Sequence, residues 1–156
     1  MSKRFSPEEA RNKILRYCAY QERSHQEVKN KLYTFGLYSS EVNQLLSDLI
    51  TEGFLNEERY AKAYAGGKFR MKKWGRLKII RELEAKGLTT TCIKIGLREI
   101  DTADYANTLK QLIIKKAAET TAENLFEKRN KVARYGIQKG YEPELVWQEI
   151  KELLPG

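Results

Sequence analysis

Three glycines impose a common register on this 156-residue chain, and this register constrains its fold more than any other feature. Gly36, Gly87 and Gly140 lie 51 and 53 residues apart, and each separates two helix-like stretches. The positions 6, 10 and 13 residues after each glycine are all aliphatic: Val42, Leu46, Leu49, Ile93, Leu97, Ile100, Val146, Ile150 and Leu153. Such spacings place side chains on one helix face. The pattern predicts three copies of a unit in which two amphipathic helices meet at a glycine turn.

Helix-start signals add a third helix to each unit. The first helix begins at Ser6-Pro7-Glu8-Glu9, a capping box with proline in the first turn, and the others begin near Asn56 and Thr102. The segment 119–124 is either a turn or the start of a long helix. No alternating strand pattern of useful length is present. We therefore predict an elongated all-α array of three tandem three-helix repeats, at residues 6–54, 56–101 and 102–154.

Composition restricts the partners and the compartment. The net charge of +8 favours a polyanionic partner, namely nucleic acid, an acidic protein surface or an anionic membrane surface. No apolar stretch approaches the roughly 20 residues of a membrane-spanning helix, and the first ten residues lack the apolar core of a signal peptide. We expect a cytoplasmic monomer. Cys18 and Cys92 are far apart in sequence, so we expect no disulfide.

The charge is concentrated in the second unit. Between Arg59 and Arg81 there are nine basic residues and no acidic one, and aromatic Phe69 and Trp74 are interleaved with them. Basic and aromatic side chains together are typical of single-strand binding, although both rings could instead belong to the core. A solvated helix face is the other interpretation of the run. The predicted partner-binding or DNA-binding residues are Arg59, Lys68, Arg70, Lys72, Lys73, Trp74, Arg76, Lys78 and Arg81.

Residue combinations suited to catalysis are missing from the sequence. The single histidine, His25, lies in the first turn after a Ser24/Glu27 capping box, where it has no partner for a metal site. Gly66-Gly67-Lys68 lacks the leading glycine of a phosphate-binding loop, so we interpret it as a weak point in a helix. We therefore predict no catalytic residue, metal ion or cofactor, and do not expect an enzyme.

One segment of the chain resembles the signature of the RecX family. Gly53-Phe54-Leu55-Asn56-Glu57-Glu58-Arg59-Tyr60-Ala61 matches a glycine, a hydrophobic pair, a short acidic step and then Arg-aromatic-Ala. The family's K-x-G, I-x-x-E-L and K-G-[IL] patterns resemble, in the same order, Lys73-Trp74-Gly75, Ile79 with Glu82-Leu83, and Lys86-Gly87-Leu88. The R-S-x-x-E-L-x-x-x-L pattern is similar to Arg23-Ser24, Glu27-Val28 and Leu32. The resemblance covers about residues 10–100, and the third unit matches only in hydrophobic pattern.

The resemblance has implications for fold and function. It implies a curved array of three-helix repeats that binds the groove of the RecA filament on DNA and regulates RecA, most often by inhibiting its recombinase, ATPase and co-protease activities in DNA repair and the SOS response. Two departures concern helix structure: Glu57 replaces the usual aspartate, and Gly66-Gly67 replaces bulkier residues. A free-standing helical DNA- or RNA-binding protein is the alternative function, and it predicts tight nucleic-acid binding without RecA.

Overall fold

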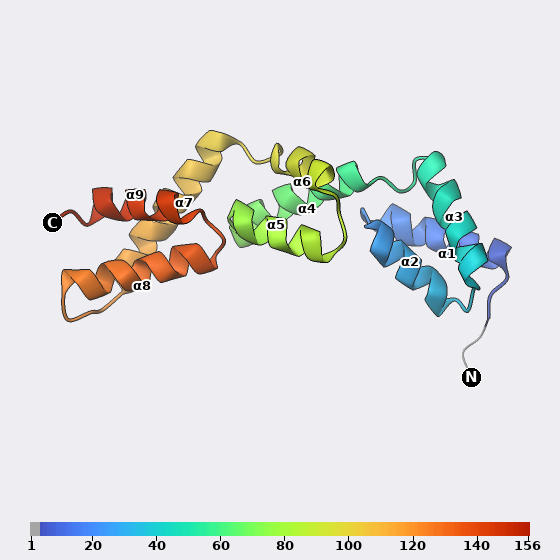
Figure 1. Cartoon of the computed structure of the whole chain (residues 1–156), viewed down its shortest axis with the longest axis horizontal. Helices are drawn as coiled ribbons and strands as arrows, with labels where there is room; N and C mark the ends of the chain where they lie inside the picture. Colours follow the sequence, from blue (N-terminus) through green and yellow to red (C-terminus); the bar gives the residue numbers. More distant parts are fainter. Residues whose placement is uncertain (1–3) are drawn as a thin grey trace.

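The computed structural model describes residues 4–156, and within them the chain folds into nine helices and no strand. The helices are α1 Pro7–Tyr20, α2 His25–Thr34, α3 Ser39–Thr51, α4 Glu57–Lys72, α5 Arg76–Ala85, α6 Thr90–Leu97, α7 Thr102–Glu119, α8 Leu125–Gln138 and α9 Pro143–Leu153. They form three groups of three along the long axis of the molecule (Figure 1). The predicted all-α array of tandem three-helix repeats is confirmed. None of the helices in this part of the chain has the length and apolar character needed to cross a membrane.

Helix ends follow the local signals of the sequence. Gly36, Gly87 and Gly140 take the left-handed conformation, with φ of +82°, +84° and +103°, directly after α2, α5 and α8. Such a φ is unfavourable for residues with a Cβ, which explains why glycine recurs at this position. Both predicted serine capping boxes are present, at Ser6 and at Ser24. Residues 120–124 connect α7 to α8, so the turn is the correct alternative for this segment.

The buried faces agree with the repeat register at most positions but not at all of them. Eight and four residues before the glycines, α2, α5 and α8 have buried residues in all three repeats: Val28, Leu32, Ile79, Leu83, Val132 and Gly136. After them, Leu46 and Leu97 are only partly buried, because Leu45 and Gly96 turn inward instead. Leu153 is also wrong as a core position, since it is 37% exposed in the last turn of α9.

The buried side chains form two separate cores. The first repeat has its own cluster, which includes Ile14, Leu32 and Leu49. The second and third repeats share one continuous cluster, in which Tyr105 and Tyr141 lie 5.0 Å apart between ring centroids. The array is therefore two hydrophobic units of unequal size, and one of them contains two repeats.

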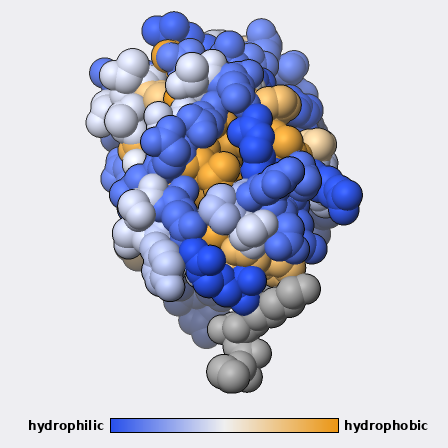
Figure 2. Space-filling view, turned by 90° about the vertical axis from the view of Figure 1, so that its right-hand side faces the viewer, coloured by the Kyte–Doolittle hydropathy of each residue, from blue (hydrophilic) through white to orange (hydrophobic). Residues whose placement is uncertain are grey.

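The first core is thinly covered at the N-terminal end of the array. Viewed along the long axis from that end, an apolar area is surrounded by hydrophilic side chains (Figure 2). A hollow of about 490 Å³ lies there between α1 and α3, with Pro7 and Leu45 among its lining residues and carboxylates such as Glu8 and Glu41 beside them. Arg11 also lines the hollow, and residues 4–54 hold equal numbers of basic and acidic residues, in contrast to the basic second repeat.

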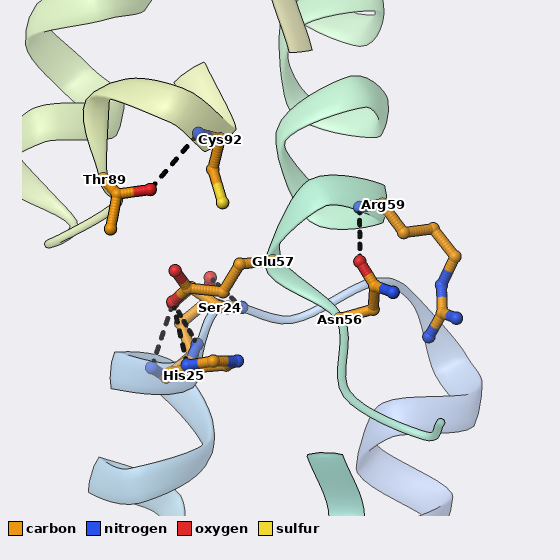
Figure 3. A network of polar contacts seen from close by, with 8 residues as sticks. Ser24, His25, Asn56, Glu57, Arg59, Thr89 and Cys92 are labelled. Carbon is orange, nitrogen blue, oxygen red and sulfur yellow. Dashed lines mark hydrogen bonds and ion pairs between the residues drawn. The ribbon is translucent and has the colours of Figure 1, made fainter. Parts of the chain in front are cut away.

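The first and second repeats meet through polar contacts. Glu57, at the start of α4, accepts a hydrogen bond from the backbone N–H of His25 at 3.3 Å, and its carboxylate is also 3.3 Å from His25 Nδ1 (Figure 3). Arg59 of α4 donates to Glu22, in the loop that follows α1. Glu57 therefore caps α2 from the neighbouring repeat, because the first N–H groups of a helix lack partners within it.

Leu32→Ala should destabilise the first core selectively, because this side chain is fully buried there and has no contact with the shared core of the other repeats. We expect a loss of about 3 kcal/mol in the unfolding free energy of the first repeat. Hydrogen exchange should show faster opening of α1–α3 and nearly unchanged protection of α4–α9. Uniform loss of protection along the chain would show that the cores unfold as one.

Candidate functional site

Lysines gather around two aromatic rings on the second repeat. The ammonium groups of Lys68 and Lys78 lie 5.0 Å and 4.5 Å from the centre of the Trp74 ring. Lys68 and Lys86 also lie over the Tyr64 ring, at 5.4 Å and 5.6 Å. Contacts of this kind stabilise the cations only modestly at exposed sites, so an anion can draw them away from the rings. We call Tyr64, Trp74, Lys68, Lys78 and Lys86 the basic–aromatic cluster.

A lysine from the third repeat lies beside this cluster. We call the basic–aromatic cluster together with Lys72, Lys73 and Lys139 the positive surface. Lys139, which follows α8, donates from Nζ to the backbone oxygen of Lys72 at 3.0 Å. Burial lowers the pKa of Lys139, and the neighbouring charges of Lys78, Lys73 and Lys72 lower it further. None of these four lysines takes part in an ion pair within residues 4–156. Positive charge at this junction is therefore uncompensated, and it suits an anionic partner.

Two of the predicted binding residues have structural partners instead. Arg59 bonds to Glu22 and to the backbone oxygen of Gly53, which lies at the end of the first repeat. Arg76 bonds to Glu142 of the third repeat at 2.7 Å and stacks on the Tyr105 ring, 3.8 Å from its centre. Each arginine joins neighbouring repeats, and a binding role for either stays a prediction.

The other predicted residues divide between the positive surface and its surroundings. Lys68, Lys72, Lys73, Trp74 and Lys78 are brought together around the end of α4. The guanidinium group of Arg70 lies back against Gly66. Arg81 is exposed on α5.

The two aromatic residues of the basic run have different environments. Phe69 is 7% exposed and packs in the shared core against Tyr105, with ring centroids 5.8 Å apart, so core packing is the correct alternative for this ring. Trp74 is partly buried and carries lysines on its ring. Beside it, a hollow of about 380 Å³ is lined by Tyr60, Tyr64, Lys68 and Lys86, with Glu22 and Glu27 opposite. Tyr64, rather than Phe69, accompanies Trp74 at the surface.

Three further features of the sequence concern a metal site, the two cysteines and the Gly66-Gly67 pair. No three histidine, cysteine or acidic side chains within residues 4–156 lie close enough together to hold a metal ion. Cys18 and Cys92 are free thiols, and burial raises the pKa of Cys18. α4 continues through Gly66 and Gly67 to Lys72, so the weak point predicted there does not interrupt the helix. The distinctive feature of the surface is therefore its charge.

The three-helix repeats agree with what is known of similar proteins. Family models for the first, second and third three-helix domains of RecX match residues 10–49, 56–97 and 103–150. The chain belongs to the RecX family. The three repeats seen in Figure 1 correspond in order to the first, second and third RecX domains.

Individual relatives span nearly the whole chain. The Regulatory protein RecX of Prosthecochloris aestuarii is 26% identical over 147 residues, which is 93% of each chain. That of Bacillus cereus is 25% identical over 137 residues, covering 88% of this chain and 51% of the longer relative. The crystal structure of RecX from Lactobacillus salivarius has a TM-score of 0.85, 22% identity and coverage of 94% of this chain and 96% of that one. These RecX relatives are named regulatory proteins, and the structural likeness supports the same fold.

Three residues of the positive surface were missing from the sequence prediction. Tyr64 and Lys86 were not among the predicted binding residues, and Lys86 lies beyond the end of the basic run. Lys139 belongs to another repeat, which has nearly equal numbers of basic and acidic residues. Local signals were available for both lysines: Lys86 directly precedes the glycine that ends α5, and Lys139 ends a stretch, residues 128–139, with five basic residues and no acidic one.

Proposed function

We propose that the chain is a non-enzymatic, cytoplasmic and monomeric regulator of the RecA recombinase. It binds in the groove of the RecA filament on DNA and inhibits the recombinase, ATPase and co-protease activities, in DNA repair and the SOS response. Its functional units are the repeats at residues 6–54, 56–101 and 102–154. Membership of the RecX family supports the choice of partner.

The observation that carries the proposal is the uncompensated group of Lys72, Lys73, Lys78 and Lys139. It lies at the junction of the second and third repeats, where a partner can extend over both. An anionic partner neutralises these charges, and the filament offers two sources of negative charge, acidic RecA surface and DNA phosphates. We assign the positive surface to the filament-bound DNA and the remaining repeat faces to RecA.

The mechanism is steric and electrostatic. An array seated in the groove occupies the space that a second DNA molecule or a cleavable repressor needs. An array that contacts more than one RecA subunit also changes the exchange of subunits, provided that it binds one filament state more tightly than the other. Neither effect requires a chemical step, so side chains that bind and exclude are sufficient.

The RecA ATPase assay on single-stranded DNA tests this function. Increasing amounts of the chain should lower the steady rate of ATP hydrolysis, with the half-effect well below one chain per RecA subunit if each bound chain blocks several subunits. An unchanged ATPase rate at a saturating amount of the chain would contradict inhibition.

A free-standing nucleic-acid-binding protein is the second candidate, and the basic–aromatic cluster favours it. That function requires tight binding to DNA or RNA without RecA and no effect on RecA activity. Under our proposal, DNA binds to the isolated chain only weakly and with the steep salt dependence of phosphate contacts. The two functions therefore differ in affinity for bare nucleic acid at physiological salt.

Trp74 provides a spectroscopic test of contact with bases. The chain has two tryptophans, so Trp147→Phe leaves Trp74 as the single indole emitter. Single-stranded DNA at low salt should quench this emission, because displacement of Lys68 and Lys78 frees the ring for stacking. In the same background, Lys68→Ala with Lys78→Ala should lower the affinity for DNA, so that more DNA is needed for half-maximal quenching. Emission that does not respond to DNA would place Trp74 in a purely structural role.

A further inference from the structure

A second basic hollow lies on the third repeat, where α7 turns into α8. It has a volume of about 420 Å³, and its lining includes Lys116, Thr121, Lys131, Arg134 and Tyr135. We call this hollow the elbow pocket. The sequence prediction did not include it, because the third repeat as a whole has nearly equal numbers of basic and acidic residues. Its residues 128–139 nevertheless include five basic residues and no acidic one. The fold separates the two signs, and three cations line the elbow pocket with one carboxylate, Glu119.

The cations of the elbow pocket remain available to a ligand. Lys116 lies with its ammonium 4.8 Å from the centre of the Tyr135 ring. Lys131 Nζ uses one of its donors on the backbone oxygen of Thr121 at 3.0 Å, which fixes the ammonium at the elbow. Within residues 4–156, no ion pair involves Lys116, Lys131 or Arg134. The pocket thus combines an oriented lysine, further cations and an aromatic ring.

The register of α8 connects the elbow pocket to the positive surface on the second repeat. Lys131 and Tyr135 are four residues apart, and Lys139 follows four residues later, so all three lie along one face of α8. Lys139 is the residue that reaches the backbone of Lys72. The distance from Lys131 to Lys139 along the helix axis is about 12 Å, at 1.5 Å per residue. In Figure 1, α8 runs from the outer end of the third repeat back toward the second.

We propose that the elbow pocket binds nucleic acid, taking one phosphodiester on its cations and a base on the Tyr135 ring. A single strand then follows α8 from the elbow pocket to the basic–aromatic cluster. The inference rests on the part of the proposed function that assigns the positive surface to DNA. It adds the third repeat as a DNA-binding element and gives the strand a path.

The residue types favour a nucleic-acid strand over an acidic protein surface. Cations distributed along a helix face match the regular repeat of phosphates, which position a strand without reading its sequence. Aromatic rings beside cations occur at both ends of the path, at Trp74 and at Tyr135. Each ring can stack on any base, as in sequence-tolerant single-strand binding.

Binding of the full-length chain to a fluorescent single-stranded oligonucleotide, without RecA, tests the path. Lys131→Glu with Arg134→Glu should weaken binding at least about tenfold at low salt and reduce the slope of log affinity against log salt by about 2. The matched control is Lys110→Glu with Lys151→Glu, which makes the same charge change at exposed positions elsewhere in the third repeat. The affinity of the control variant should fall only slightly, because its net charge is lower, and its slope of log affinity against log salt should stay close to that of the wild type.

Further variants separate the outcomes. Arg134→Ala removes one cation without adding a repulsive charge, and it should still reduce the salt slope if the double variant fails to fold. Inorganic phosphate at constant ionic strength should not displace the oligonucleotide, since a strand makes several contacts at once. Displacement by phosphate would indicate a small-anion pocket and overturn the strand path.

Two other results would also overturn the strand path: equal slopes for the pocket and control variants, or no binding of the oligonucleotide at low salt. A chain that binds DNA along this path but leaves RecA unaffected would contradict the proposed function alone.

Discussion

Changing Lys73, Lys78 and Lys139 together to glutamate should abolish inhibition of the RecA ATPase while leaving the chain folded. These ammonium groups crowd one another without a carboxylate partner, so the free chain gains little from their charge. Reversal places three carboxylates against the negative partner and removes several phosphate contacts. We expect the half-inhibitory concentration to rise by at least about 100-fold, because each lost phosphate contact also removes its counterion release.

A triple variant elsewhere on the surface controls for net charge. Lys29, Lys94 and Lys151 are exposed and lie outside the positive surface, so their change to glutamate alters the total charge equally. This control should inhibit RecA at close to the wild-type concentration, and circular dichroism should show equal helix content in both variants. If both triple variants lose inhibition to the same extent, net charge rather than this group of lysines governs binding.

Gly75→Ala should cause the largest loss of stability of any single methyl addition in the shared core. A Cβ at this position would lie 2.3 Å from backbone atoms of Gly140 and Tyr141, so neighbouring repeats would have to separate. The same contact carries backbone hydrogen bonds from Gly75 to Lys139 and from Leu77 to Gly140, both at 2.9 Å. We expect a loss of about 3 kcal/mol in unfolding free energy, together with weaker RecA inhibition as Lys139 moves away from Lys72.

Gly67→Ala is the matched control for this effect. Gly67 lies inside α4, and a Cβ there would meet no atom within 4 Å. Since alanine is the better helix former, the free energy of unfolding of this variant, measured by chemical denaturation, should rise by about 1 kcal/mol. Equal stability changes in the two variants would show that the close approach of Gly75 and Gly140 does not hold the repeats together.

The sequence predicted the fold because its signals are local. A helix start such as Ser6-Pro7, or a glycine that must be left-handed such as Gly87, depends only on nearby residues. Burial was less predictable where two helix positions compete. Leu45 and Leu46 are chemically alike, and only the packing against α1 and α2 places Leu45 further inside.

The candidate site was only partly predictable, because its residues come from different repeats. Lys73, Trp74 and Lys78, all from the basic run, lie close together in the structure, and their binding role stays a prediction. It could not show that Arg76 pairs with a glutamate 66 residues away, or that Lys139 joins the group from α8. Such pairings are set by the contact between repeats, which leaves no trace in the local sequence.

Co-sedimentation with RecA filaments tests the central claim most directly. RecA is assembled on single-stranded DNA with a non-hydrolysable nucleotide, the purified chain is added, and the pelleted fraction is measured against DNA alone and RecA alone. We predict that the chain pellets with the filaments in a saturable manner at physiological salt, and that the Lys73, Lys78 and Lys139 triple variant stays in the supernatant. A wild-type chain that remains in the supernatant with filaments, or pellets equally with bare DNA, would contradict the assignment to RecA.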